Sequence, residues 1–352
     1  MNQRFEGEFA SMSKLTLACV GAGNWGRNLT RTFASLPDVR LKTICDASES
    51  ALEKMSMQYP QAGITTDYST VLDDSEIQAV VLAVPTVEHF ESAHRALVAG
   101  KHVYVEKPIA LSLEKARALT ELAEAKDLTL MVGHLLEYHP AVDLLKKLIE
   151  EEELGDILYV YAERVNLGVV RKDENALWSL APHDISIILY LLEEEPESVS
   201  ARGACYLQKG IEDVVFANLR FSDGKMAQVQ VSWLDPHKVR KLTVVGTKKM
   251  VVFDDMESSE KVRIYDKAAE QKSSSEALYE SYGESITLRF GDVVIPHISP
   301  AEPLKLEAQH FVSCVQSGDT PRSDGRDGMR VVRVLEAAQA SLEADGVPTV
   351  LQ

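Results

Sequence analysis

The sequence has few cysteines and no long apolar run. Its 352 residues include four cysteines, which are widely spaced and form no C-x-x-C pair: Cys19, Cys45, Cys205 and Cys314. This scatter argues against a disulfide framework or a zinc knuckle, and it is typical of proteins from a reducing compartment. The longest apolar stretches, 79–84 and 185–192, are far shorter than the ~20 residues that span a bilayer. We therefore expect no membrane association.

Positive charge is also scarce. The chain has 37 lysines and arginines against 54 aspartates and glutamates, for a formal net charge of −17 at pH 7. A field of this sign repels phosphate backbones, so we expect no nucleic-acid partner, and an anionic small ligand would need a local basic pocket. Residues 1–13 mix polar and apolar types without the apolar core of a signal peptide. These features favour a cytoplasmic protein.

The first 135 residues alternate short β-rich runs with helical patterns. We expect strands at 15–20, 41–45, 79–84, 102–105 and 129–132, and helices at 26–36, 51–58, 89–99 and 113–126. The apolar runs are continuous rather than alternating, which is typical of parallel strands covered on both faces. Residues 1–135 are therefore predicted to form an α/β domain.

The pattern changes after about residue 150. We expect strands at 157–165, 199–206, 214–221, 225–233, 241–245, 250–254 and 261–265, with one strong helix at 183–192. Residues 222–224, Ser-Asp-Gly, are a hairpin turn signal. The polar segment 267–283 predicts a mobile loop, and 304–317 and 328–344 predict closing helices that can pack back on the first domain. Residues 136–352 are predicted to form an α+β domain with a large, mostly antiparallel open sheet.

An open antiparallel sheet leaves one face bare unless something covers it. Self-pairing of such faces gives closed symmetric oligomers. We therefore expect a homodimer or homotetramer that assembles through the sheet of the second domain.

A glycine motif directly follows the first predicted strand. Residues 21–26 read Gly-Ala-Gly-Asn-Trp-Gly, which fits G-x-G-x-x-G at the strand-to-helix position that the dinucleotide fingerprint requires. Gly21 permits the tight turn, Gly23 lets the backbone approach the pyrophosphate, and Gly26 lets the helix pack close to the strand. We expect these glycines, together with Asn24 and Trp25, to bind a dinucleotide in a Rossmann domain.

Asp46 lies at the end of the second predicted strand, 20 residues after Gly26. A carboxylate there accepts hydrogen bonds from ribose hydroxyls and repels a 2′-phosphate, which favours NAD over NADP. The alternative interpretation is a structural glycine turn followed by a surface aspartate.

Two further segments follow predicted strands of the same sheet. Glu106-Lys107-Pro108 comes after 102–105, and Val84-Pro85-Thr86 ends the third strand, so both face the crevice where open α/β sheets bind ligands. The proline fixes the backbone after Lys107 and aims its side chain. A surface lysine before a turn is the alternative. The residues expected to contact the cofactor here are Val84, Pro85, Thr86, His89, Glu106 and Lys107.

His183 follows a proline that suits a first helical turn. The positive end of a helix disfavours the imidazolium, which keeps His183 neutral and able to accept a proton. A lone histidine near an apolar helix is, however, more often structural.

These motifs together resemble the Gfo/Idh/MocA oxidoreductases. The resemblance extends over residues 14–345 and rests on the glycine loop, the Asp46 position, Ala83-Val84-Pro85, Glu106-Lys107-Pro108, and the C-terminal segments 302–304 and 330–332. Segments 133–140, 163–168 and 180–186 look most like the sugar-nucleotide branch. That branch includes UDP-N-acetylglucosamine and UDP-N-acetylglucosaminuronate 3-dehydrogenases.

The resemblance implies a hydride passed between a sugar carbon and the nicotinamide of NAD. By position, Lys107 matches the family lysine that contacts the reacting hydroxyl, and His183 matches the histidine acid/base. Many relatives carry aspartate four residues before that histidine, where this chain has Ser179. The resemblance therefore leaves a relay that runs through Lys107 and His183 alone.

The expected function is an NAD-dependent dehydrogenase acting on a secondary alcohol, at C3, of a nucleotide-linked sugar. Four residues near His183 could receive an anionic diphosphate or a uronate carboxylate, with ordinary surface charge as an equally good interpretation: Arg164, Arg171, Lys172 and Asn175. Tyr138 could line the sugar pocket or equally be a packed core residue, and Ser179 and His183 complete the candidate substrate residues. A free polyol, inositol or aldose is an alternative substrate, and the arginine group discriminates between the two, because a neutral polyol needs no guanidinium cluster. A cofactor-binding sensor without turnover is an alternative of another class. No metal is expected, because no group of potential ligands has metal-site spacing.

Overall fold

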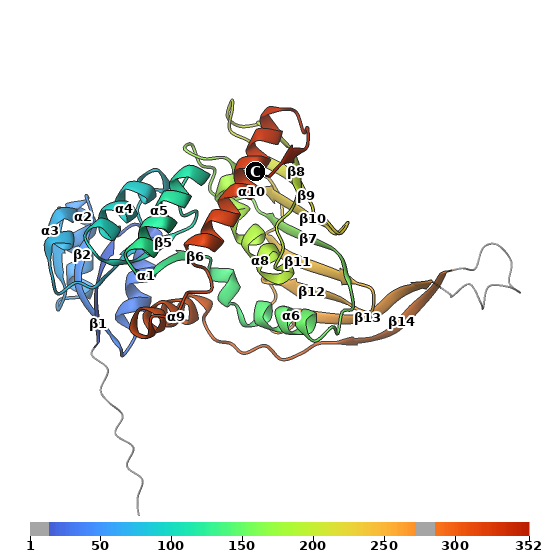
Figure 1. Cartoon of the computed structure of the whole chain (residues 1–352), viewed down its shortest axis with the longest axis horizontal. Coiled ribbons are helices and arrows are strands. Elements are labelled where there is room, and N and C mark those ends of the chain that lie inside the picture. Colours follow the sequence, from blue (N-terminus) through green and yellow to red (C-terminus); the bar gives the residue numbers. More distant parts are fainter. Residues whose placement is uncertain (1–13, 272–285, 352) are drawn as a thin grey trace, which may run out of the picture.

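The computed structural model describes residues 14–271 and 286–351 and contains two β-sheets separated by helices (Figure 1). Helix α10 (Gly325–Glu343) contacts elements of both halves, among them α5 (Leu113–Ala125) and β8 (Ser198–Ala204). The terminal segment 1–13, on which the signal-peptide argument rests, lies outside the described residues.

The first sheet is parallel throughout, with strand order β3-β2-β1-β4-β5-β6. Its elements are β1 (Leu15–Val20), α1 (Asn24–Ala34), β2 (Val39–Cys45), α2 (Glu49–Gln58), β3 (Gly63–Thr65), α3 (Tyr68–Asp73), β4 (Ala79–Leu82), the 3-10 helix η1 (Thr86–Glu88), α4 (His89–Val98), β5 (His102–Glu106), α5 and β6 (Leu130–Gly133). The predicted Rossmann-type domain is confirmed. Three elements, β3, α3 and η1, were not predicted, because each is short and carries little apolar pattern.

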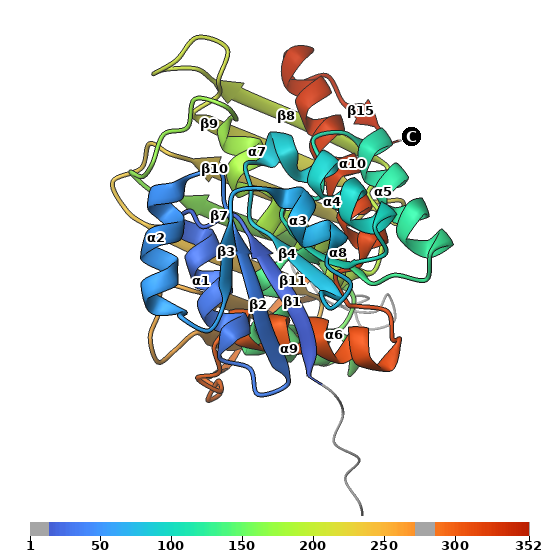
Figure 2. The same cartoon turned by 90° about the vertical axis from the view of Figure 1, so that its left-hand side faces the viewer.

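Both faces of this sheet are covered (Figure 2). Helices α1 and α2 lie on one side, and α3, α4 and α5 on the other. Neighbouring residues of β1 enter different cores: Leu17 packs with α1 and α2, while Ala18 packs with α4 and α5. This explains why β1 is buried at every position, since a strand covered on both faces has no solvent side.

The second sheet is mixed but mostly antiparallel, in the order β14-β13-β12-β11-β7-β10-β9-β8-β15, with β7 and β10 as its parallel pair. Its strands are β7 (Ile157–Val165), β8, β9 (Val214–Arg220), β10 (Met226–Ser232), β11 (Val239–Gly246), β12 (Met250–Asp254), β13 (Val262–Gln271), β14 (Ile286–Val294) and β15 (Thr349–Val350). The α+β class is confirmed.

Two expectations for the second half were wrong in part. Residues 267–271 are not a loop: they continue β13, where they pair with 286–290 of β14. The remaining residues of the predicted loop, 272–283, lie outside the described residues. The second half also has more than one strong helix before the closing pair, since α6 (Pro140–Glu150) and α7 (Ala176–Leu180) accompany α8 (Pro182–Leu192). Helix α6 begins with Pro140 and is capped by His139, whose ring nitrogen accepts from a backbone amide.

One face of the second sheet packs on helices and the other is open. Along β7, Val160 and Ala162 are buried, whereas Tyr159 and Tyr161, which alternate with them, are exposed. Alternation of this kind places one face in the core and the other outside. The oligomer expected from the open face stays a prediction.

The closing helices join the two halves. Leu304 and Phe311 of α9 (Pro303–Ser317) pack in the core beside α1. On α10, Val332 enters the core of the first sheet, and Val331 and Leu335 enter that of the second. We propose residue 135 as the domain boundary, with both closing helices counted in the second domain.

Candidate active site

A cavity of about 540 Å³ lies where the C-terminal ends of β4, β5 and β6 meet the second sheet and α8. Crevices at this end of a parallel sheet are where open α/β folds bind ligands. The residues that line it are Trp25, Ala83, Val84, Pro85, Thr86, His89, Glu106, Lys107, Gly133, Leu135, Leu136, Arg164, Arg171, Asp173, Glu174, Leu180, His183 and Arg240.

The glycine loop borders this cavity and is tightly built. Gly21 has φ +95°, and a Cβ on it would overlap the carbonyl of Ala83. A Cβ on Gly26 would overlap the carbonyl of Gly21. Gly23, by contrast, has no heavy atom within 4 Å of a Cβ position and stands at the N-terminus of α1, which no side chain caps. The open space at Gly23 and the uncapped amides fit a pyrophosphate group.

Asp46 is tied to this loop. One carboxylate oxygen accepts from the backbone N–H of Ala22 at 2.5 Å, and the other accepts from that of Ser48 at 2.7 Å. The carboxylate therefore helps to close the loop at the end of β2, which is the position from which it would reach a ribose.

Glu106 and Lys107 face the cavity from the end of β5. The indole N–H of Trp25 donates to Glu106 Oε1, so the glycine loop and β5 are joined by side chains. Burial raises the pKa of Glu106 to about 7. Burial also lowers the pKa of Lys107, whose ammonium donates to the backbone carbonyl of Ser179 at 2.9 Å. That bond holds the lysine across the cavity toward α7.

His89 braces the same wall. Its Nδ1 lies 2.7 Å from the carbonyl oxygen of Pro108 and its Nε2 lies 3.0 Å from that of Val84. Burial lowers its pKa. The ring lies between the ends of β4 and β5, where as a neutral imidazole it donates to one of these two carbonyls, and it helps to keep Val84, Pro85 and Lys107 in fixed relation.

His183 lies opposite, in the first turn of α8 directly after Pro182. Burial lowers its pKa well below the ordinary histidine value, and the positive charges of Lys107, Arg164 and Arg240 lower it further. Among the described residues, its Nδ1 is buried and has no hydrogen-bond partner. The ring is thus a neutral base that shares the cavity with Lys107.

The predicted substrate residues are divided by the structure. Arg164 lines the cavity, but its guanidinium makes two hydrogen bonds, at 2.6 and 2.9 Å, to the buried carboxylate of Asp184. Arg171 also lines it and pairs with Glu174 at 3.0 Å. The charges of Arg164 and Arg171 are therefore largely balanced by carboxylates.

Tyr138 and Asn175 do not line this cavity. The Tyr138 hydroxyl lies 3.0 Å from Ser323 Oγ in the core. The Asn175 side chain caps α7 by accepting from the Trp178 amide, and it donates to Glu212. Both geometries correspond to the structural alternative for these residues. Ser179 approaches the cavity through its carbonyl, which holds Lys107.

Comparison with known proteins agrees with this geometry. Residues 15–134 match an oxidoreductase family with an NAD-binding Rossmann fold, and residues 142–252 match the GFO/IDH/MocA C-terminal domain. The chain belongs to the Gfo/Idh/MocA family.

Its relatives within the family act on different substrates. A scyllo-inositol 2-dehydrogenase (NAD(+)) of Bacillus subtilis is 26% identical and is covered over 95% of both chains. A UDP-N-acetylglucosamine 3-dehydrogenase of Acidithiobacillus ferrooxidans is 24% identical over 95% of this chain and 99% of the relative. A solved structure of that dehydrogenase superposes with a TM-score of 0.78 at 22% identity, over 95% of this chain and 99% of the other. A levoglucosan dehydrogenase complexed with NADH and levoglucosan has a TM-score of 0.81 at 22% identity, over 96% and 100%.

The family assignment gives the general activity. This Gfo/Idh/MocA protein is an NAD-dependent oxidoreductase. Within the described residues, α10 and every other helix fall short of the length and apolarity that a membrane span requires.

Sequence reasoning missed one cavity residue of clear chemical interest. Arg240 on β11 lies directly opposite Arg164 of β7 in the antiparallel register. Its closest carboxylate is Asp255 at 3.6 Å, and its side chain is 41% exposed. No sequence signal marks Arg240, because the pairing of β11 with β7 joins segments about 75 residues apart and cannot be read from local spacing.

Proposed function

We propose that this protein is an NAD(H)-dependent dehydrogenase or ketoreductase acting on a secondary alcohol, at C3, of a nucleotide-linked sugar such as UDP-N-acetylglucosamine or its uronate. The observation that supports it most is the presence of Lys107, neutral His183 and Arg240 in one cavity. The UDP-sugar relative, aligned over nearly the whole length of both chains, supports the same choice.

His183 is suited to act as the general base. Its lowered pKa leaves the imidazole unprotonated at neutral pH, so it can take the proton of the substrate hydroxyl. Its Nδ1, which has no partner among the described residues, marks unused hydrogen-bonding capacity in a buried ring. The NAD nicotinamide, when bound, supplies the hydride acceptor.

Lys107 is suited to stabilise charge on the reacting oxygen. As the hydroxyl loses its proton and becomes a carbonyl, negative charge develops on oxygen, and a buried ammonium is a strong partner for it. The bond from Lys107 Nζ to the carbonyl of Ser179 fixes the ammonium without a carboxylate. A backbone carbonyl therefore anchors the ammonium of Lys107 in this chain.

Arg240 favours an anionic substrate over a neutral polyol. Arg164 is fully engaged by Asp184, and Arg171 pairs with Glu174, whereas Arg240 has one loose ion pair in reach of the cavity. The Arg240 guanidinium, which has only this loose ion pair, is well placed to bind a diphosphate or a uronate carboxylate.

A free polyol is the second candidate. The 26% identity to a scyllo-inositol dehydrogenase over 95% of both chains favours it, and such a substrate would use Lys107 and His183 without Arg240.

Thermal unfolding followed by NADH absorbance tests the choice. NAD alone should raise the unfolding midpoint, because a ligand of the native state stabilises it by about 2.7 kcal/mol at a hundredfold excess over Kd. UDP-N-acetylglucosamine or its uronate should raise it further and produce NADH. Production of NADH from myo-inositol alone would transfer the assignment to the polyol.

We also propose that the protein is a homo-oligomer that assembles through the open face of the second sheet. Exposed Leu158, Tyr159, Tyr161 and Phe216 on this sheet support the proposal. Light scattering of the full chain should give a dimer or tetramer mass, and a monomer at micromolar concentration would contradict it.

A further inference from the structure

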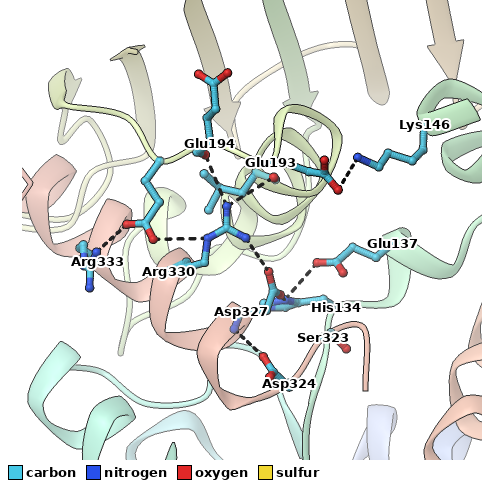
Figure 3. A network of polar contacts seen from close by, with 12 residues as sticks. His134, Glu137, Lys146, Glu193, Glu194, Ser323, Asp324, Asp327, Arg330 and Arg333 are labelled. Carbon is cyan, nitrogen blue, oxygen red and sulfur yellow. Dashed lines mark hydrogen bonds and ion pairs between the residues drawn. The ribbon is translucent and has the colours of Figure 1, made fainter. Parts of the chain in front are cut away.

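Three ligand-type side chains meet in the interior, outside the proposed catalytic pair. His134 follows β6, Glu137 lies in the 3-10 helix η2 (Leu135–Tyr138), and Asp327 lies in the first turn of α10. His134 Nδ1 is 2.6 Å from Asp327 Oδ2 and 3.4 Å from Glu137 Oε1 (Figure 3). One ligand atom from each residue falls within 4.8 Å of the others.

The cluster is buried and incompletely satisfied. Glu137 is fully buried, and among the described residues neither of its carboxylate oxygens has a hydrogen-bond partner. Figure 3 shows its carboxylate directed at the His134 ring. A buried carboxylate without hydrogen bonds is costly unless a cation or a proton compensates it. A cation held between His134 and Glu137 would compensate this carboxylate.

One arginine lies close to the cluster. Arg330 lies 3.8 Å from Asp327, but it also lies 3.6 Å from Glu195, so its charge is shared. Two buried carboxylates thus attract a cation at the imidazole nitrogen.

We propose that His134, Glu137 and Asp327 form a binding site for one divalent first-row transition-metal ion, with Zn²⁺ as the preferred occupant. One imidazole and two carboxylates are donors that Zn²⁺ accepts, and Mn²⁺ stands lowest in the affinity order of the divalent first-row metals. Mg²⁺ and Ca²⁺ prefer all-oxygen shells and fit less well.

The distances suit an ion of this size. Ligand atoms bound at about 2.0–2.2 Å from one ion lie roughly 3.0–3.5 Å apart. The 3.4 Å between His134 and Glu137 already has this value, and Asp327 must retreat by less than about 1 Å.

The proposed ion site lies beside a surface cavity and between elements of the two halves of the chain. Asp327 and Arg330 line a cavity of about 400 Å³ between α8 and α10, which offers an entry path. A bound ion would join β6 and η2 to α10, and so link the end of the first sheet to the closing helix. We infer a stabilising role, since Lys107 and His183 belong to a different cavity.

The test uses the full chain, without an affinity tag, stripped with a chelator and dialysed. Titration calorimetry with Zn²⁺, and separately with Mn²⁺ and Co²⁺, should show one ion per chain, tightest for Zn²⁺, with a rise in the unfolding midpoint. Wild-type protein that binds none of the three ions overturns the proposal.

Matched variants locate the ion. Glu137→Gln and Asp327→Asn keep side-chain shape but remove ligand charge, and each should weaken Zn²⁺ binding by at least about 100-fold, since loss of even an outer partner costs about 10–100-fold. Glu307→Gln is the control, because Glu307 is an equally buried carboxylate with an unpartnered oxygen outside the cluster. Equal Zn²⁺ affinity in wild type and both ligand variants would overturn the assignment. Ion counting by mass spectrometry reads out binding whether or not a variant is active.

Discussion

The two walls of the active-site cavity are built on different principles. The wall from the first sheet takes its groups from short contiguous motifs, such as Glu106 and Lys107 at the end of β5. The wall from the second half takes His183 from α8, Arg164 from β7 and Arg240 from β11. In the proposed function, the first wall contacts the cofactor and supplies Lys107, and the second wall supplies His183 and the arginines that meet the substrate. Divergence of substrate among relatives of similar identity fits this division.

The largest effect should come from removing the groups that face each other across the two walls. His183→Ala should lower turnover by about 10²–10⁴-fold because it removes the general base. Lys107→Ala should lower it by about 10²–10³-fold because it removes charge stabilisation at the reacting oxygen. Steady-state kinetics measures both. NAD binding should survive in each variant, and unchanged turnover in either one would contradict its role.

Within the cofactor wall, two glycines should respond differently to the same methyl group. Gly23→Ala should fold normally, since its Cβ enters open space, but it should weaken NAD binding by at least about tenfold, or about 1.4 kcal/mol, because that space is the pyrophosphate site. Gly26→Ala should also lower the unfolding midpoint, because its Cβ overlaps the carbonyl of Gly21. Calorimetry with NAD provides the affinities. Wild-type NAD affinity in Gly23→Ala would contradict the site.

On the substrate wall, Arg240→Gln tests the anion preference. KM for a UDP-sugar should rise about tenfold with kcat nearly unchanged, as expected when a charge-assisted contact to a distant group is lost. Lys241→Gln, the neighbouring residue on β11, is the control, because Lys241 pairs with Asp254 and does not line the cavity. An equal rise in KM for both variants would contradict a contact between Arg240 and the anionic part of the substrate.

The pH dependence of stability should reflect the buried carboxyl group of Glu106. Burial raises its pKa from 4.5 to about 7, so its contribution to folding is fully present below about pH 4.5 and is lost as pH rises through 7. Such a shift corresponds to at most about 3 kcal/mol. Without NAD, the Glu106→Gln variant should therefore be more stable than wild type at pH 8, whereas the two proteins should differ little in stability at pH 5. Denaturant unfolding measures it, with the exposed Glu114→Gln as control, and a gain of equal size at both pH values would contradict the shift.

The contrast between the walls also explains what the sequence could predict. The glycine loop and Lys107 follow strands directly, so local order alone placed them at one end of the first sheet. His183 could be placed at a helix N-terminus by Pro182, but its neighbours could not. Arg164 is an example. Its partner Asp184 lies 20 residues away on another element, so only the folded structure shows that this arginine is already ion-paired.

Other features of the second half could not be predicted for the same reason, since they depend on contacts between residues far apart in the sequence. Arg240 enters the cavity through the register of β11 with β7, and Asp327 reaches His134 across 193 residues of sequence. Residues 267–271 look like a loop because they are polar, yet pairing with β14 makes them a strand. Long-range pairing, rather than local propensity, determines each of these cases.

Transfer of an isotopic label tests the central claim most directly. UDP-N-acetylglucosamine or its uronate carrying deuterium at C3 is mixed with the protein and NAD, and the NADH formed is analysed by mass spectrometry. We predict that deuterium appears in NADH, and that the His183→Ala protein forms almost none. NADH without deuterium would show that another carbon is oxidised. No NADH from either sugar nucleotide, together with NADH from myo-inositol, would contradict the proposed substrate.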